Sequence, residues 1–298
     1  MILITGASGA IGARLTSRLA ADGANPVAAG RRPSEIAQRW PDLRVVLVDV
    51  LRPETLAPAL EQIETAYYLV HSMEPGVERF EETDQIAASN FARAAKEAGV
   101  ERVMYLGGLG TGDAEAMSSH LTSRQEVGRV LAAEGPTLLE FRAAMVVAAE
   151  SASFRMLQDL VNRLPAMIVP RWVDTRSQPI AVDDVIEYLV AGASVPLAQH
   201  HTVVEIGGPE RITYREMLRA YAASRGTTRP IVGVPFLTPW LSSLWCGLTT
   251  SVPAELARPL IQGMSTELVV RDDSAARLFP HIHPIGFRDA MKRALEEG

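Results

Sequence analysis

The chain begins with a short apolar stretch that breaks into three evenly spaced glycines. Residues 1–4 read MILI, which is long enough for a buried strand, and the sequence GASGAIG follows over residues 6–12. A strand that opens into a helix through such a turn presents free backbone amides and the positive end of the helix dipole to an anion. This start of the chain predicts a phosphate-binding turn, followed by a helix over residues 10–21.

Each of the three glycines has a separate task in a turn of this kind. Gly6 permits the tight turn, Gly9 lets the backbone approach a pyrophosphate, and Gly12 lets the new helix lie close to the strand. Ser8 and Ile11 stand between the glycines and complete the set of residues that we expect beside the bound phosphates. Glycines occur in many turns, so the flanking strand and the Ala/Leu-rich helix are what make this pattern specific.

A second strand is predicted over residues 26–30, and it ends in two arginines. About twenty residues after the glycine turn, a site that prefers NAD places an acidic residue on the adenosine ribose hydroxyls. Arg31 and Arg32 offer guanidinium groups instead, and their N–H donors suit a 2′-phosphate. The sequence therefore favours NADPH over NADH as the cofactor. The alternative is a pair of solvated arginines in a loop.

Apolar runs with little alternation recur along the chain, as is typical of parallel strands that are covered on both faces. They comprise residues 43–48, 65–70, 102–106, 137–142 and 202–206. Helical patterns separate them, including an amphipathic segment over residues 80–99 and another that runs from Ser118 or Ser119 to Glu134. Six strand-helix alternations predict an α/β protein with a doubly wound parallel sheet, the Rossmann fold.

The alternation changes beyond Val147. A helix over residues 153–163 precedes a stretch rich in Pro, Trp and Arg, and the chain from about residue 227 is helical and interrupted by prolines. We expect residues 1–150 and about 179–207 to form the dinucleotide-binding domain. Residues 151–178 and 208–298 are then predicted to form a smaller, mostly helical lobe that binds substrate.

Polar residues follow two of the predicted strands at the edge where a dinucleotide would pass. Asp49 and Val50 come after the third strand, and His71 and Ser72 come after the fourth. Asp49 is placed to accept a hydrogen bond from the adenine amino group, or to cap the turn before the helix that Pro53 begins. Both interpretations of Asp49 stay open.

Composition excludes several other classes of function. A net charge of -6 argues against non-specific nucleic-acid binding. The single cysteine excludes an internal disulfide and a cysteine-built metal cluster. Six histidines are present without carboxylates or cysteines at metal-ligand spacing, so we expect no metal site.

The chain begins inside its first strand, so we expect no signal peptide and a cytoplasmic location. Its most apolar region is residues 231–248, which Pro235 and Pro239 interrupt and which is marginal in length for a membrane span. We interpret it as the wall or lid of an apolar pocket, with Trp240 as a candidate substrate contact. A peripheral membrane contact is the alternative. Nothing in the sequence indicates the oligomeric state.

Several motifs resemble those of the extended and atypical short-chain dehydrogenase/reductase superfamily. They are the glycine turn, the strand that ends in arginine, Asp49, and the segments IAVDDV, IGGPE and TYRE at residues 180–185, 206–210 and 213–216. A narrower resemblance, to bacterial NAD(P)H-binding proteins related to NmrA-like regulators and to the Rossmann-type accessory subunit of respiratory complex I, rests on four further segments. These are YLVHSM at 68–73, LGGLG at 106–110, HLTSR at 120–124 and PRW at 170–172. The resemblance covers essentially the whole chain.

The sequence departs from that superfamily where the catalytic residues would stand. The resemblance implies a serine after the fifth strand and a Tyr-x-x-x-Lys pair on the next helix, but the chain has Gly107 or Gly108 in the first place and His120 with Arg124 in the second. Residues four apart share a helical face, so both side chains can point toward the cofactor. Histidine exchanges a proton near neutral pH, and arginine binds a ribose or phosphate.

Two hypotheses follow from this substitution. In the first, the protein is an NADPH-dependent reductase of an apolar carbonyl or quinone-type acceptor, with His120 as proton donor and Arg124 as an anchor for the cofactor. In the second, it is a non-catalytic NAD(P)H-binding sensor or assembly protein. A sugar-type epimerase stays open as a third. Candidate contacts to an apolar or aromatic substrate are Ser123, Arg171, Trp172 and Arg176, for which a contact between lobe and domain is the alternative.

Overall fold

A computed structural model describes residues 1–71, 80–110, 118–233 and 261–297, and it is built around one parallel sheet of seven strands. The strand order is β11-β6-β5-β4-β1-β2-β3. The strands are β1 (Ile2–Thr5), β2 (Val27–Gly30), β3 (Val45–Leu47), β4 (Thr65–Tyr68), β5 (Arg102–Gly108), β6 (Thr137–Ala143) and β11 (His201–Ile206). The chain moves outward from β1 to β3, crosses back to β4 on the other side of β1, and then moves outward again. This order confirms the predicted doubly wound sheet.

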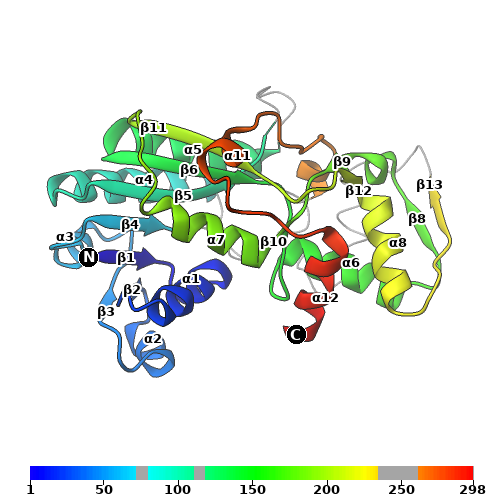
Figure 1. Cartoon of the computed structure of the whole chain (residues 1–298), viewed down its shortest axis with the longest axis horizontal. Coiled ribbons are helices and arrows are strands. Elements are labelled where there is room, and N and C mark those ends of the chain that lie inside the picture. The colour runs from blue at the N-terminus through cyan, green and yellow to red at the C-terminus, as the bar shows by residue number, and fades with distance from the viewer. Residues whose placement is uncertain (72–79, 111–117, 234–260, 298) are drawn as a thin grey trace.

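Helices cover both faces of the sheet, and a separate apolar core lies under each layer (Figure 1). The elements of one face are α1 (Ala10–Ala21), α2 (Pro33–Arg39), α7 (Val182–Gly192) and α11 (Ser274–Leu278). Those of the other face are the 3₁₀ turn η1 (Pro53–Thr55), α3 (Leu56–Leu60), α4 (Phe80–Glu97) and α5 (Ser119–Glu134). Because both faces are covered, the strands are mostly apolar and do not show a strict alternation of apolar and polar residues.

A lobe with its own core adjoins the carboxyl ends of the strands. Among the described residues, Figure 1 shows the helices of this lobe gathered at one end of the molecule. They are α6 (Ala152–Arg163), α8 (Tyr214–Ser224) and α12 (Phe287–Glu297). Three strand pairs connect them: β7 (Val146–Val147) with β10 (Ile180–Ala181), β9 (Arg176–Ser177) with β12 (Ile212–Thr213), and β8 (Met167–Val169) with β13 (Ile231–Gly233). The 3₁₀ turn η3 (Arg171–Asp174) follows β8.

Local sequence signals explain where several of these helices begin and end. The Thr213 hydroxyl accepts a hydrogen bond from the backbone N–H of Glu216, and the Glu216 carboxylate accepts one from the Thr213 N–H, at 3.2 and 2.7 Å. This is the capping box that TYRE predicts. Gly99, which follows α4, has φ of +74°, a conformation that favours glycine and ends the helix.

Some of the predicted features fall outside the residues that the structure describes. Ser72, Trp240 and most of the apolar region over residues 231–248 are among them, as are the side chains of Arg171 and Trp172. In the described segments, no helix has both the length and the apolar character that a bilayer crossing requires. The same segments hold no group of three or more His, Cys, Asp or Glu residues arranged for a metal ion.

Candidate active site

The glycine turn joins β1 to α1 with no space for side chains at two of its positions. Gly6 has φ of +68°, and a Cβ atom there would lie 2.7 Å from the Leu69 carbonyl oxygen. A Cβ atom on Gly12 would lie 2.1 Å from the Gly6 carbonyl oxygen, well inside van der Waals contact. The turn is therefore compressed between the end of β4 and the first turn of α1, and only glycine fits at either position.

Gly9 has a different environment, because it is exposed and lines a cavity. A Cβ atom there would meet only the Gly6 carbonyl oxygen, at 3.3 Å. No side chain caps α1, so its first-turn amides remain for an external acceptor. Ser8 is exposed on the same turn, and Ile11 also lines the cavity. The turn fits the pyrophosphate of a dinucleotide in shape and in the donors that it offers.

Candidate adenine contacts follow the next two strands. Arg31 and Arg32 follow β2, and both are exposed, with Arg32 paired to Glu35 at 3.2 Å. One Asp49 carboxylate oxygen accepts a hydrogen bond from the Leu51 N–H at 3.1 Å, so this side chain caps the turn before η1. The capping interpretation is confirmed, and because a carboxylate has two oxygens the adenine contact stays a prediction.

Val50 lies beside Asp49 and is buried in the core under α3 and α4. Its carbonyl oxygen accepts a hydrogen bond from the Asn90 side chain of α4 at 3.0 Å. Helix α4 therefore fixes the position of the Val50 backbone after β3, while the neighbouring Asp49 stays partly exposed. The predicted cofactor contact of Val50 remains a prediction.

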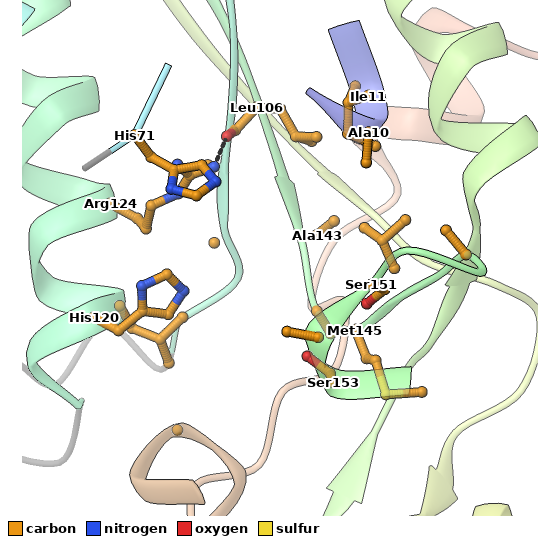
Figure 2. Close-up of a pocket in the computed structure, with 18 of the residues that line it drawn as sticks. Ala10, Ile11, His71, Leu106, His120, Arg124, Ala143, Met145, Ser151 and Ser153 are labelled. Atoms are coloured by element: carbon orange, nitrogen blue, oxygen red, sulfur yellow. Dashed lines mark hydrogen bonds between the residues drawn. The ribbon is translucent and has the colours of Figure 1, made fainter. Parts of the chain in front are cut away.

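A cavity of about 370 Å³ extends from the glycine turn into the lobe. Figure 2 shows His71, His120 and Arg124 on one wall, opposite Ala143, Met145, Ser151 and Ser153. The lining is mostly apolar and also includes Leu69, Leu106, Leu121, Tyr214, Met264 and Leu268. Its position at the carboxyl ends of β1, β4, β5 and β6 is where the nicotinamide half of a dinucleotide lies in this fold. One end of the cavity is thus formed by the sheet domain and the other by the lobe.

Arg124 and His120 lie one turn apart on the same face of α5, as their spacing predicts. The Arg124 guanidinium donates to the Leu106 carbonyl oxygen at 2.5 Å, and it lies 5.4 Å from the centre of the Tyr105 ring. The Tyr105 hydroxyl in turn donates to the Arg124 carbonyl oxygen at 2.9 Å. These contacts hold a fixed positive charge at the wall of the cavity, beside the end of β5.

His120 has a strongly perturbed proton equilibrium. Burial, together with the smaller electrostatic effects of Arg124 and His71, lowers the pKa of His120 to about 3. The imidazole is therefore neutral at pH 7, although an isolated histidine titrates near pH 6.5. A neutral imidazole has one N–H donor and one acceptor nitrogen, and it has no imidazolium proton to give. Any proton that it passes to an acceptor must be replaced from water.

Two candidate substrate contacts lie away from this cavity. Ser123 is 2% exposed, and its hydroxyl donates to the buried carboxylate of Asp84 on α4 at 3.1 Å. Its position on α5 turns it toward α4, since it is offset by one residue from the face that carries Arg124. Ser123 is therefore not among the residues that line the cavity, and its substrate contact stays a prediction. Arg176 lies exposed on β9 and is not among the cavity residues.

The absence of the superfamily's serine is built into the packing of α5 on β5. A Cβ atom on Gly108 would come within 2.7 Å of the Leu121 side chain, and one on Gly107 within 3.1 Å of the Glu140 carboxylate and the Tyr105 ring. A serine at either position would displace its neighbours. Gly108 lets α5 approach the end of β5 closely, with the Leu121 and Arg124 side chains packed against it.

The lobe side of this cavity has no recognisable sequence motif. Tyr214 is the first residue of α8, Met145 and Ser151 come from the segment between β6 and α6, and Ser153 lies in the first turn of α6. None of these residues has a local pattern that indicates a binding site, because only the tertiary fold brings them opposite the glycine turn. The one local feature that fits a binding site at this edge of the sheet is a strand end followed by small residues, at residues 143–153.

Comparisons with known proteins agree with this arrangement. Residues 6–148 match a family model described as NAD(P)H-binding. A nucleoside-diphosphate-sugar epimerase from Staphylococcus aureus superposes with a TM-score of 0.78 at 18% identity, covering 97% of this chain and 99% of that one. No curated protein matches the sequence.

Two reductases have similar structures. The Citrobacter sp. triphenylmethane reductase complexed with NADP(H) has a TM-score of 0.75 at 17% identity, over 98% of this chain and 99% of the other. The NADPH-dependent quinone oxidoreductase from Escherichia coli, complexed with NADPH, has a TM-score of 0.76 at 19% identity, over 99% and 100%. Identities this low establish the shared fold alone. Residues 6–148 therefore match an NAD(P)H-binding family model, and the chain shares its Rossmann fold with these two reductases and this epimerase.

Proposed function

We propose that the protein is an NADPH-dependent reductase of an apolar carbonyl or quinone-type acceptor. The observation that carries this proposal is the mostly apolar cavity of about 370 Å³ that continues from the glycine turn past His120 and Arg124 into the lobe. A cavity of that size suits a small aromatic or quinone-like molecule. Structural similarity to a quinone oxidoreductase and a triphenylmethane reductase supports the same choice.

NADPH would supply the hydride, and the residues of this chain would orient the two reactants. Gly9 and the first turn of α1 bind the pyrophosphate, and Arg124 anchors the cofactor beside the end of β5. Hydride addition to a carbonyl carbon leaves negative charge on its oxygen. The neutral His120 donates a hydrogen bond to that oxygen and relays a proton, giving one from the first ring nitrogen while the second takes one from water.

Replacing His120 tests this assignment. Because the relay requires a ring with two nitrogens, both His120→Ala and His120→Gln are expected to lower kcat by about 100-fold. NADPH affinity should change little in either variant. NADPH oxidation would be followed at 340 nm against a panel of quinones, aldehydes and enones, with exposed His281→Ala as the matched control. Unchanged turnover in His120→Ala would remove His120 from the mechanism, and no oxidation of NADPH with any acceptor would refute the reductase.

The choice of NADPH over NADH rests on Arg31 and Arg32. A 2′-phosphate carries charge that these exposed guanidinium groups would pair with, whereas the ribose hydroxyl of NADH offers none. Arg31→Ala and Arg32→Ala are each expected to raise the Kd of NADPH about five- to tenfold while leaving that of NADH unchanged. Fluorescence titration measures both constants, and Arg39→Ala on exposed α2 is the control. Equal loss of affinity for both cofactors would contradict the assignment.

A non-catalytic NAD(P)H-binding sensor is the second candidate function. One observation favours it: the usual serine, tyrosine and lysine are replaced by glycine, a neutral histidine and an arginine. Such a sensor would bind NADPH tightly, and the binding would change the stability or partner binding of the lobe without consuming the cofactor. The acceptor screen separates the two functions, because only the reductase oxidises NADPH.

A further inference from the structure

Three segments that are far apart in the sequence meet at a single guanidinium group. Arg14 is on α1, one turn beyond the glycine turn, and its Nη1 atom lies 2.9 Å from both carboxylate oxygens of Glu150. Its Nη2 atom donates to the carboxylate of Glu297 at 2.5 Å. We infer that Arg14 is a positioning residue that holds the lobe wall of the cavity against the dinucleotide-binding helix, through Glu150 and Glu297.

Glu150 stands next to the part of the lobe that faces the glycine turn. Ser151, Ala152 and Ser153 follow it directly and line the cavity, as do Gly9 to Gly12 on the other side. The Ser151 N–H donates to the Ala148 carbonyl oxygen at 3.1 Å, which closes the turn that carries Glu150. Pulling Glu150 toward α1 therefore sets the distance between the two walls of the cavity.

Glu297 extends the same contact to the C-terminal helix. It is the last residue of α12, whose other face packs into the lobe core through Phe287, Ala290, Met291 and Ala294. Arg14 is 20% exposed, whereas Glu150 and Glu297 are 45% and 41% exposed. A partly buried arginine that pairs two carboxylates from different segments has more geometric constraint than an isolated surface pair.

We call this arrangement of Arg14, Glu150 and Glu297 the Arg14 clasp. It makes cofactor binding depend on the position of the lobe wall as well as on the glycine turn. The first turn of α1 would hold the pyrophosphate of the proposed cofactor, and the same helix holds the lobe wall one turn further on through Arg14. Loss of the clasp should let residues 148–153 move away from the cavity, so that NADPH and its acceptor bind to a more open site. The inference rests on the proposed NADPH site for this consequence, but not for the clasp itself.

Electrostatics and positioning predict opposite results for one variant. Glu150→Gln removes a negative charge near the phosphate-binding turn, so simple electrostatics predicts tighter binding of the anionic cofactor. The clasp predicts weaker binding, because the glutamine cannot hold the arginine as a charged, two-pronged acceptor. We therefore expect Glu150→Gln to raise the Kd of NADPH about threefold to fivefold, and Arg14→Met to raise it by at least as much.

Helix α1 offers a matched control in Arg18. This residue also pairs two carboxylates, Glu187 of α7 and Asp22, but neither of them is near the cavity. Arg18→Met should leave the Kd of NADPH within twofold of the wild-type value. A comparable loss of thermal stability in Arg14→Met and Arg18→Met would show that any difference in Kd is not a general effect of unfolding.

Hydrogen exchange of the ligand-free protein supplies the second readout. Amides of residues 148–155 are expected to exchange about fivefold faster in Glu150→Gln and Arg14→Met than in the wild type, and unchanged in Arg18→Met. Weaker NADPH binding together with faster exchange in Glu150→Gln supports the clasp. Tighter or unchanged binding, or unchanged exchange, overturns it. If the wild type binds no NADPH, the proposed function fails, and the exchange comparison still decides the clasp.

Discussion

Replacing Gly12 by alanine is expected to abolish measurable NADPH binding and to lower the free energy of unfolding by about 2 to 3 kcal/mol. The added methyl group would lie 2.1 Å from the Gly6 carbonyl oxygen and 2.8 Å from its carbon, both of which are backbone atoms that no rotamer change can move. Helix α1 must then shift away from β1, which displaces the amides that face the pyrophosphate. Cofactor titration and thermal unfolding of Gly12→Ala measure the two effects.

Gly9→Ala is the matched control for that variant. Its methyl group would lie 3.3 Å from the Gly6 carbonyl oxygen and otherwise project toward the cavity. It should leave the melting temperature near the wild-type value while weakening NADPH binding about tenfold or more, because it occupies the space where the backbone approaches the phosphates. Normal NADPH affinity in Gly12→Ala would contradict the assignment of the turn.

Glu140→Gln is expected to destabilise the fold by about 2 kcal/mol, since it neutralises a fully buried carboxylate that is paired with Arg142 and hydrogen-bonded to His201. Glu140 on β6 accepts hydrogen bonds from Arg142 at 2.7 Å and from His201 at 2.8 Å. The glutamine keeps the shape but presents an N–H group to one of these donors. Chemical unfolding at pH 7 measures the loss of stability.

The stabilisation that the Glu140 carboxylate provides is expected to depend on pH. Burial raises the pKa of Glu140, and the hydrogen bonds and charges of His201 and Arg142 lower it by more, so its pKa lies below the usual value. The unfolded state then binds the proton more readily, and the stabilisation is complete above the unfolded pKa of about 4.3. It is lost as the pH falls through the folded value. The difference between wild type and Glu140→Gln should therefore shrink below about pH 4.

Glu134→Gln is the control, because Glu134 at the end of α5 also pairs with a cation but remains a third exposed. Its loss of stability should stay below about 0.5 kcal/mol at pH 7. Equal losses in Glu134→Gln and Glu140→Gln would show that burial of Glu140 adds nothing.

The sheet domain could be predicted because its information is local. Apolar runs of strand length, the three glycines and the helix ends each depend on a few neighbouring residues, and the structure confirms them for β1, α1 and the capping box of α8. The spacing of His120 and Arg124 likewise fixed their common helical face. In each case a single element carries the signal.

The lobe wall could not be predicted, because its residues meet only in the folded chain. Met145 and Ser151 come from the segment between β6 and α6, and Tyr214 comes from α8. Glu150 and Glu297 come together at Arg14 without any sequence pattern. Ser123 shows that neighbours in the sequence need not face the same space. It lies next to a cavity residue in the sequence, but one step along a helix rotates a side chain by about 100°, and Asp84 binds it on the far side.

The strand order places the two ends of the predicted dinucleotide site in different parts of the sequence. Everything beside the predicted adenine end, from the glycine turn through Arg31 to Asp49, is encoded in the first fifty residues, on β1, β2 and β3. Apart from Gly9 to Gly12 of the glycine turn, the residues that line the cavity come from positions 69–268. A change in the later part of the sequence can therefore alter which acceptor fits while leaving Arg31 and Arg32 in place.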